Sequence, residues 1–186
     1  QNWIYGSVFS IRRWSEYATV QPYFLGRKQY GDPLNLSNAL KVHRDTYAPG
    51  LRVYGVINDF DYDFDLNKQF GEIGEFRQLG TVQNAVQTTV QHDAIAYAFE
   101  AGYTFSDFPW KPRISANYAY GSGNKSPYDS VNQTFDIFYG FNQPFSRDDY
   151  FAWNNVKAPK ARIEFTPFKD LKVDTAFSAY WLASAA

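Results

Sequence analysis

Charged side chains stand at every second position of several segments whose intervening residues are apolar. Side chains at this spacing share one face of a β-strand, where they could line a watery pore and select solutes by charge and hydrogen bonding. For any single residue, hydration with cross-strand ion pairing is the commoner role, and Arg52–Asp65 and Arg162–Asp174 would fit it. As a set, five basic and six acidic groups predict a wet interior without a clear anion preference. The predicted pore-lining residues are Arg52, Asp61, Asp63, Asp65, Glu100, Arg113, Lys160, Arg162, Glu164, Lys172 and Asp174.

A cation site is the second chemistry that the carboxylates suggest. Asp61, Asp63 and Asp65 lie in steps of about 7 Å along one strand face, which is too far for two of them to chelate one ion. The oxygen-bearing residues between positions 122 and 136 lack the spacing of a calcium loop, so we interpret them as turn formers. We therefore predict no metal and no cofactor. These loop residues are Asn124, Asp129, Asn132 and Asp136.

Catalytic side chains are scarce in this sequence. It contains no Cys, and its two histidines, His43 and His92, fall near strand ends or loops without a serine elbow motif beside them. We therefore predict that the protein is not an enzyme. The absence of Cys also excludes disulfides and thiolate metal ligands. A formal charge of −1 argues against a nucleic-acid partner.

The composition favours a membrane β-barrel. Of the 186 residues 20% are aromatic, yet the mean hydropathy is −0.47 and no apolar run is long enough for a transmembrane helix. A barrel reconciles these values because apolar and polar residues alternate along its strands, with aromatic girdles at both membrane interfaces. The loop aromatics Tyr128, Tyr139 and Phe141 remain open to a carbohydrate role. Aromatic residues near strand ends are interpreted as interface anchors, namely Trp3, Trp14, Tyr17, Trp110, Tyr150, Trp153 and Trp181.

Residues 60–67 show the clearest alternation, with an apolar residue at every second position. The preceding dipeptide, Asn58–Asp59, is of the kind that closes a tight hairpin. Pairing Ile57 with Phe60 makes one face of the hairpin apolar and the other polar throughout, so the register is self-consistent. The same register predicts the pairs Val53–Phe64, Leu51–Leu66, Arg52–Asp65 and Tyr54–Asp63.

The pattern recurs and predicts an all-β fold, an antiparallel up-and-down transmembrane β-barrel segment of about eight strands. Connections alternate between short and long, as in outer-membrane barrels, so the turns at 58–59, 106–112 and 167–170 should lie at one end. Aromatic side chains should face lipid and charges should face inward. We interpret residues 1–186 as a single barrel portion that is incomplete at both ends. The expected strands cover residues 3–10, 17–28, 51–57, 60–67, 94–105, 113–120, 160–166 and 171–181.

Several short motifs resemble the alginate-export family of bacterial outer-membrane barrels. In chain order they are His43–Thr46, Phe60–Asp63, Ala101–Thr104, Pro109–Arg113, Tyr120–Asn124, Asn132–Phe135, Asp149–Asn154 and Tyr180–Leu182. Two positions depart from the family pattern. Asn124 stands where the family usually has an acid, and Gln143–Phe145 lacks the His that often precedes the aromatic element.

The resemblance implies a porin-like channel in the outer membrane of a Gram-negative bacterium. Its partners would be outer-membrane lipid and either small hydrophilic solutes or an anionic polysaccharide such as alginate, passing through a polar lumen. The loop at residues 121–152 is expected to fold inward or to cap the mouth. One alternative is an adhesion or ligand-binding barrel with a plugged lumen, and another is a soluble β-protein that binds carbohydrate.

Overall fold

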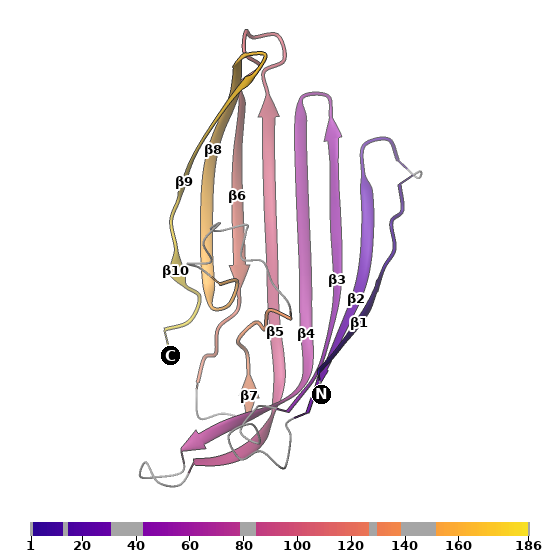
Figure 1. Cartoon of the computed structure of the whole chain (residues 1–186), viewed down its shortest axis with the longest axis vertical. Helices are drawn as coiled ribbons and strands as arrows, with labels where there is room; N and C mark the ends of the chain where they lie inside the picture. The colour runs from indigo at the N-terminus through magenta and orange to yellow at the C-terminus, as the bar shows by residue number, and fades with distance from the viewer. Residues whose placement is uncertain are drawn as a thin grey trace.

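The computed structural model describes residues 2–12, 15–30, 43–78, 85–126, 130–138 and 152–185. These residues form one large β-sheet without α-helices, as the alternating sequence predicts (Figure 1). None of the described residues belongs to a helix that could span a membrane. The strands are β1 (Asn2–Val8), β2 (Thr19–Gln29), β3 (Arg44–Ile57), β4 (Phe60–Gln78), β5 (Ala85–Thr104), β6 (Arg113–Gly121), β7 (Val131–Asn132), β8 (Val156–Phe168), β9 (Leu171–Ser178) and β10 (Trp181–Leu182).

The long strands are antiparallel and follow one another in chain order from β1 to β6, after which β8 joins β6 and β9 joins β8. This up-and-down order confirms the predicted fold class. Two strands of only two residues add to the predicted set: β7 pairs in parallel with β5, and β10 pairs with β8. Among the described residues β1 has no pairing with β9 or β10, so the sheet is open.

The β3–β4 hairpin has the predicted register. Ile57 pairs with Phe60, and the four other predicted pairs are also present. Asn58 adopts a φ of 54° at the turn, a left-handed conformation that Asn tolerates better than most residues. The sequence therefore determines both the position of this turn and the face on which each side chain of the hairpin lies.

Four strands are longer than the alternation predicts, and one of them is β8, which begins at Val156 rather than at residue 160. β3 begins at Arg44 rather than at residue 51, because the Pro49–Gly50 pair interrupts the sequence pattern without ending the strand. β4 continues to Gln78 and β5 begins at Ala85, so most of the stretch between the expected strands 60–67 and 94–105 is also strand. The β4–β5 hairpin consequently extends beyond its neighbours at the lower end of Figure 1.

The three predicted short turns lie together at the upper end of Figure 1. Hydrogen bonds join them directly: the Thr104 amide donates to the Asp59 carbonyl at 2.8 Å, and the Thr166 amide donates to the Trp110 carbonyl at 2.9 Å. The β4–β5 connection, residues 79–84, has only six residues, so the predicted alternation in length fails there. The arrangement does confirm that the three short turns lie at one end of the sheet, with the other long-strand connections at the opposite end. Below, these are called the short-turn end and the long-loop end.

The two faces of the sheet differ in chemistry. Directly paired residues point to the same side, so Asp63 and Glu100 lie on one face, called the polar face, and Phe64 and Phe99 lie on the opposite, apolar face. Buried residues occur mainly on the polar face, whereas Phe99 is 45% exposed. A soluble barrel would show the reverse, with its aromatic side chains packed in the core.

The apolar face has the layout of a membrane-facing surface. From Ile95 to Tyr103 its β5 side chains are apolar over about 27 Å, close to the ~25 Å band of outer-membrane barrels. Beyond this band Asp93 pairs with Lys68 of β4. A row of neighbouring aromatic rings then follows across three strands at the long-loop end, with Phe24–Tyr47 centroids 6.1 Å apart and Tyr47–Phe70 centroids 5.7 Å apart.

Candidate functional site

The predicted pore-lining residues share the polar face. One row across the sheet pairs Asp63 with Glu100, Glu100 with Asn117, and Asn117 with Lys160. Asp65 and its partner Arg52 lie one row towards the long-loop end. The other members lie in the rows towards the short-turn end. The structure thus brings the set together on one surface, and its role in lining a pore remains a prediction.

Arg113 of β6 is the centre of the charged network on this surface. Its guanidinium donates to Asp61 at 2.8 Å, to Glu100 at 3.0 Å and to Glu164 at 2.7 Å. Three carboxylates on three other strands therefore share one cation. Lys172 contacts the same Glu164 at 2.8 Å and extends the network to β9.

A second group of contacts surrounds Arg52. The sequence predicted a pair with Asp65, which is directly opposite, but the Arg52 guanidinium binds Asp63 instead and lies 4.9 Å from the Tyr54 ring centre. Asp65 accepts a hydrogen bond from the Tyr23 hydroxyl at 2.8 Å. Tyr23 can reach Asp65 because its ring lies over Gly50, where an added Cβ would meet the ring at 2.0 Å.

The other predicted pair, Arg162–Asp174, is present at 3.6 Å. Lys160 has no ion pair among the described residues. The charges at the short-turn end therefore largely neutralise one another, which fits the near balance of basic and acidic groups in the sequence. Cross-strand pairing of this kind stabilises a wet face and leaves little excess field of either sign.

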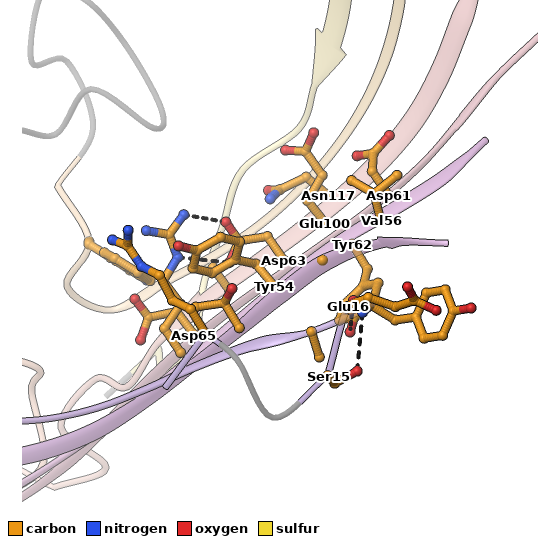
Figure 2. A pocket seen from close by; sticks show the side chains of 18 residues that line it. Ser15, Glu16, Tyr54, Val56, Asp61, Tyr62, Asp63, Asp65, Glu100 and Asn117 are labelled. Atoms are coloured by element: carbon orange, nitrogen blue, oxygen red, sulfur yellow. Dashed lines mark hydrogen bonds and ion pairs between the residues drawn. The ribbon is translucent and has the colours of Figure 1, made fainter. Parts of the chain in front are cut away.

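A hollow of about 690 Å³ lies on the polar face. Its floor includes Asp63, Asp65 and Glu100, and the turn between β1 and β2 contributes Glu16 and Tyr17 to one side. Figure 2 shows side chains from several neighbouring strands projecting towards the same space. Hydroxyl, carboxylate and guanidinium groups meet here, and such a lining suits hydrated or hydroxyl-rich solutes.

Part of the long connection between β6 and β8 lies against the polar face. Because β6 ends at Gly121, the long-loop half of β5 has a free edge, and β7 pairs there with Gln91 and His92. Phe135 then packs on Ala94 and Ala96 and is only 8% exposed. The described residues of this connection thus fold inward over the sheet, as the sequence predicts for the loop at 121–152.

Asp136 fixes this segment to the strands on its far side. Its carboxylate accepts hydrogen bonds from Arg27 of β2 at 3.1 Å and from Arg44 of β3 at 2.5 Å. Its backbone is held by Gln69 of β4, whose amide group donates to the Asp136 carbonyl at 2.7 Å and accepts from the Asp136 amide at 2.9 Å. We call these contacts of Asp136 with Arg27, Arg44 and Gln69 the Asp136 latch.

His92 supports the latch from below. It is 2% exposed, and its Nε2 lies 3.1 Å from the Gln69 Oε1 atom. The residue lies beyond the Lys68–Asp93 pair that ends the apolar band and so outside the part of β5 that faces the membrane interior in our interpretation. Burial lowers the pKa of His92 below its ordinary value of 6.5, partly opposed by the nearby Asp136 carboxylate.

Some sequence interpretations of the loop need correction. Asp136 was grouped with turn formers but binds two arginines, whereas Asn132 does form a turn, accepting from the Thr134 amide at 2.9 Å. Trp153 was expected at the membrane interface but packs against Phe135 beside the polar face. Among the other expected sites, Asp129, Trp14, Tyr128, Tyr139, Phe141 and Tyr150 lie outside the described residues.

The expected anchors on the strands and short turns differ in position. Trp3, Trp110 and Trp181 are each about 60% exposed, at 63%, 59% and 58% respectively. Tyr17 borders the hollow on the polar face. An interface role for the three tryptophans remains a prediction.

Sequence reasoning missed the residues that hold the latch, Arg27, Arg44, Gln69 and His92. The alternation from Arg44 through Thr46 continues into the predicted strand and could have placed Arg44 on the polar face. Gln69 likewise continues the polar positions of β4. Their partner Asp136 carries no such periodic signal, because its position depends on the path of a loop.

Comparison with known proteins agrees with this architecture. A family model described as alginate export matches residues 1–186. No curated protein matches the chain. Since the family match covers every residue, the chain belongs to the alginate export family.

Proposed function

We propose that this chain forms part of the wall of an outer-membrane channel through which an anionic polysaccharide such as alginate, or small hydrophilic solutes, pass passively. The family is named for export rather than for a catalysed reaction. In this proposal the apolar face contacts lipid and the polar face contacts the permeant in water. Location in the outer membrane of a Gram-negative bacterium is part of the proposal.

The observation that carries the proposal is the opposition of the two faces of one sheet. Exposed rings such as Phe99 lie on one side, while the other side holds the Arg113 network. Lysine or arginine on a lipid face near the bilayer midplane would cost roughly 2–4 kcal/mol each. The polar face must therefore be the watery side, and a surface rich in hydrogen-bonding groups supports passage of a hydroxylated chain.

The Asp136 latch supports a restricted mouth rather than a wide pore. Asp136 brings residues from the β6–β8 connection across to β2 and β3, so the segment spans the polar face at the long-loop end. In the proposed channel, a solute leaving at this end would pass beside the docked segment. Loosening of the segment would widen the path.

Conductance of the full-length protein in planar bilayers tests the proposal. We expect stepwise ion currents, and we expect uronate oligosaccharides added on either side to reduce them in a concentration-dependent way. A neutral oligosaccharide of equal length is the matched control for charge. The double variant Phe135→Ala/Asp136→Asn should raise the current per channel, because it removes the ring packing and the ion pairs that help to hold the segment on the sheet.

Two results would contradict the proposed channel. Absence of current in a correctly inserted protein, also in the double variant, would favour the adhesion barrel with a plugged lumen. A protein that remains monodisperse without detergent would contradict membrane insertion and favour the soluble carbohydrate-binding alternative.

A further inference from the structure

Two neighbouring turns at the short-turn end enclose a hollow of about 430 Å³, which shares no lining residue with the hollow on the polar face. One turn joins β5 to β6 and the other joins β8 to β9. The Thr166 amide donates to the Trp110 carbonyl at 2.9 Å and ties the two turns together. The hollow is lined by Trp110, Lys111, Thr166, Pro167, Phe168 and Lys169.

The backbone around this hollow is held in an unusual conformation. Trp110 and Lys111 both have positive φ angles, 71° and 44°, although neither is glycine. A residue with a Cβ is disfavoured in this conformation and adopts it only where surrounding contacts enforce it. Here the Lys111 amide donates to the Phe108 carbonyl at 3.1 Å and fixes the turn. Both Trp110 and Lys111 line the hollow.

The lining combines cations with exposed aromatic surface. Lys111 and Lys169 have no acidic partner among the described residues. Asp107 and Asp170 belong to the same turns but do not line the hollow. Trp110 is 59% exposed and Phe168 is 70% exposed, so large rings flank the two lysines.

The hollow is also continuous with the apolar face. The Trp110 ring lies next to the Phe165 ring with centroids 6.1 Å apart, and Phe165 pairs with Val173 on that face. Aromatic residues at this level of a barrel mark the interface where lipid headgroups begin. A ligand here would contact lysine side chains at one end and the apolar face of the strands at the other.

We propose that this hollow binds the headgroup of an anionic phospholipid, with its phosphate between Lys111 and Lys169 and its acyl chains along Phe165. The proposal rests on the membrane setting of the proposed function but not on the permeant. Charge complementarity and continuity with the apolar face both favour a lipid over a soluble anion. The bound lipid would fix the depth of the short-turn end in the membrane.

Native mass spectrometry of the full-length protein, released from detergent and titrated with phosphatidylglycerol, tests the site. We expect one phosphatidylglycerol to be retained more strongly than phosphatidylcholine. The variant Lys111→Gln/Lys169→Gln should weaken this binding roughly 30-fold, because each lysine near a membrane surface contributes about 1 kcal/mol to the binding free energy. The variant Lys111→Arg/Lys169→Arg should retain it.

The control variant Lys125→Gln removes an exposed lysine from the β6–β8 connection, away from the hollow, and should bind as the unmodified protein does. Equal phosphatidylglycerol binding in the Lys111→Gln/Lys169→Gln variant would overturn the proposal. Displacement of the lipid by millimolar inorganic phosphate would assign the site to a soluble anion and also overturn it. Planar-bilayer conductance of the same variants separates the two proposals, because loss of lipid binding with normal current leaves the channel function intact.

Discussion

The Arg113 guanidinium lies directly over Gly102, where an added Cβ would come within 2.4 Å of its Nη2 atom. Because Gly102 has no side chain, Arg113 can cross β5 and reach Asp61 on β4. Glycine weakens a strand interior by its entropy and its lack of packing, so its presence here is explained by this close approach. The contact connects β4, β5, β6 and β8 through one side chain.

Substitution Gly102→Val should therefore destabilise the protein. Valine has the higher strand propensity, so propensity alone predicts a gain. We expect instead a loss of about 1–3 kcal/mol, because Arg113 can no longer reach Asp61 and a partly buried carboxylate loses its partner. Urea unfolding in lipid vesicles, followed by tryptophan fluorescence, measures the change. Ala101→Val, one residue away on the apolar face, adds similar bulk without crossing an arginine and should have little effect.

Substitution Asp136→Asn should release the docked segment. The amide keeps the size of the side chain but loses the charge that two guanidinium groups bind, at a cost of about 2 kcal/mol. Backbone amides of residues 130–138 should then exchange with deuterium roughly 30-fold faster. Asp107→Asn, in a turn at the opposite end, serves as the control. Unchanged exchange in the Asp136 variant would show that its ion pairs with Arg27 and Arg44 do not hold the segment.

Acidification should loosen the same segment through His92. Its pKa is lowered in the docked state, so protonation is disfavoured there and more favourable once the residue is exposed. Stability of the docked segment is complete above the ordinary value of 6.5 and declines as the pH falls from there towards the lowered pKa. Deuterium exchange of residues 130–138, corrected for the intrinsic pH dependence of exchange, should accelerate between pH 7.5 and pH 5. The variant His92→Gln should lose this pH dependence, and a persistent effect would point to another titrating group.

Local alternation was sufficient to predict the sheet, because each hairpin register follows from which face is apolar. The Ile57–Phe60 pairing is the clearest case, since a shift of one residue would place Arg52 among apolar side chains. The strand limits were less predictable. Lys68 interrupts the apolar face of β4, and only its pairing with Asp93 shows that the strand continues.

The site was predicted as a face but not as a set of contacts. Period-two spacing assigns Arg113 to the polar face, yet its three partners depend on the missing side chain at Gly102 and on strand neighbours far apart in sequence. The Asp136 latch was beyond sequence reasoning for a similar reason. It joins a loop residue to β2 and β3, and loop paths follow no repeating pattern.

The assignment of the lipid side can be tested at two neighbouring positions. Phe99 lies on the apolar face and pairs with Tyr118, while Asn117, next to Tyr118 on the same strand, lies on the polar face. Phe99→Arg should lower the free energy of unfolding in lipid vesicles by roughly 2–4 kcal/mol, the cost of a cation near the bilayer midplane. Asn117→Arg places the same group at the same depth beside Glu100 and should cost little, because water and a carboxylate receive it. Unfolding titrations of both variants decide between the two sides. If Asn117→Arg is the more damaging change, the polar face is not the watery side and the proposed channel wall is wrong.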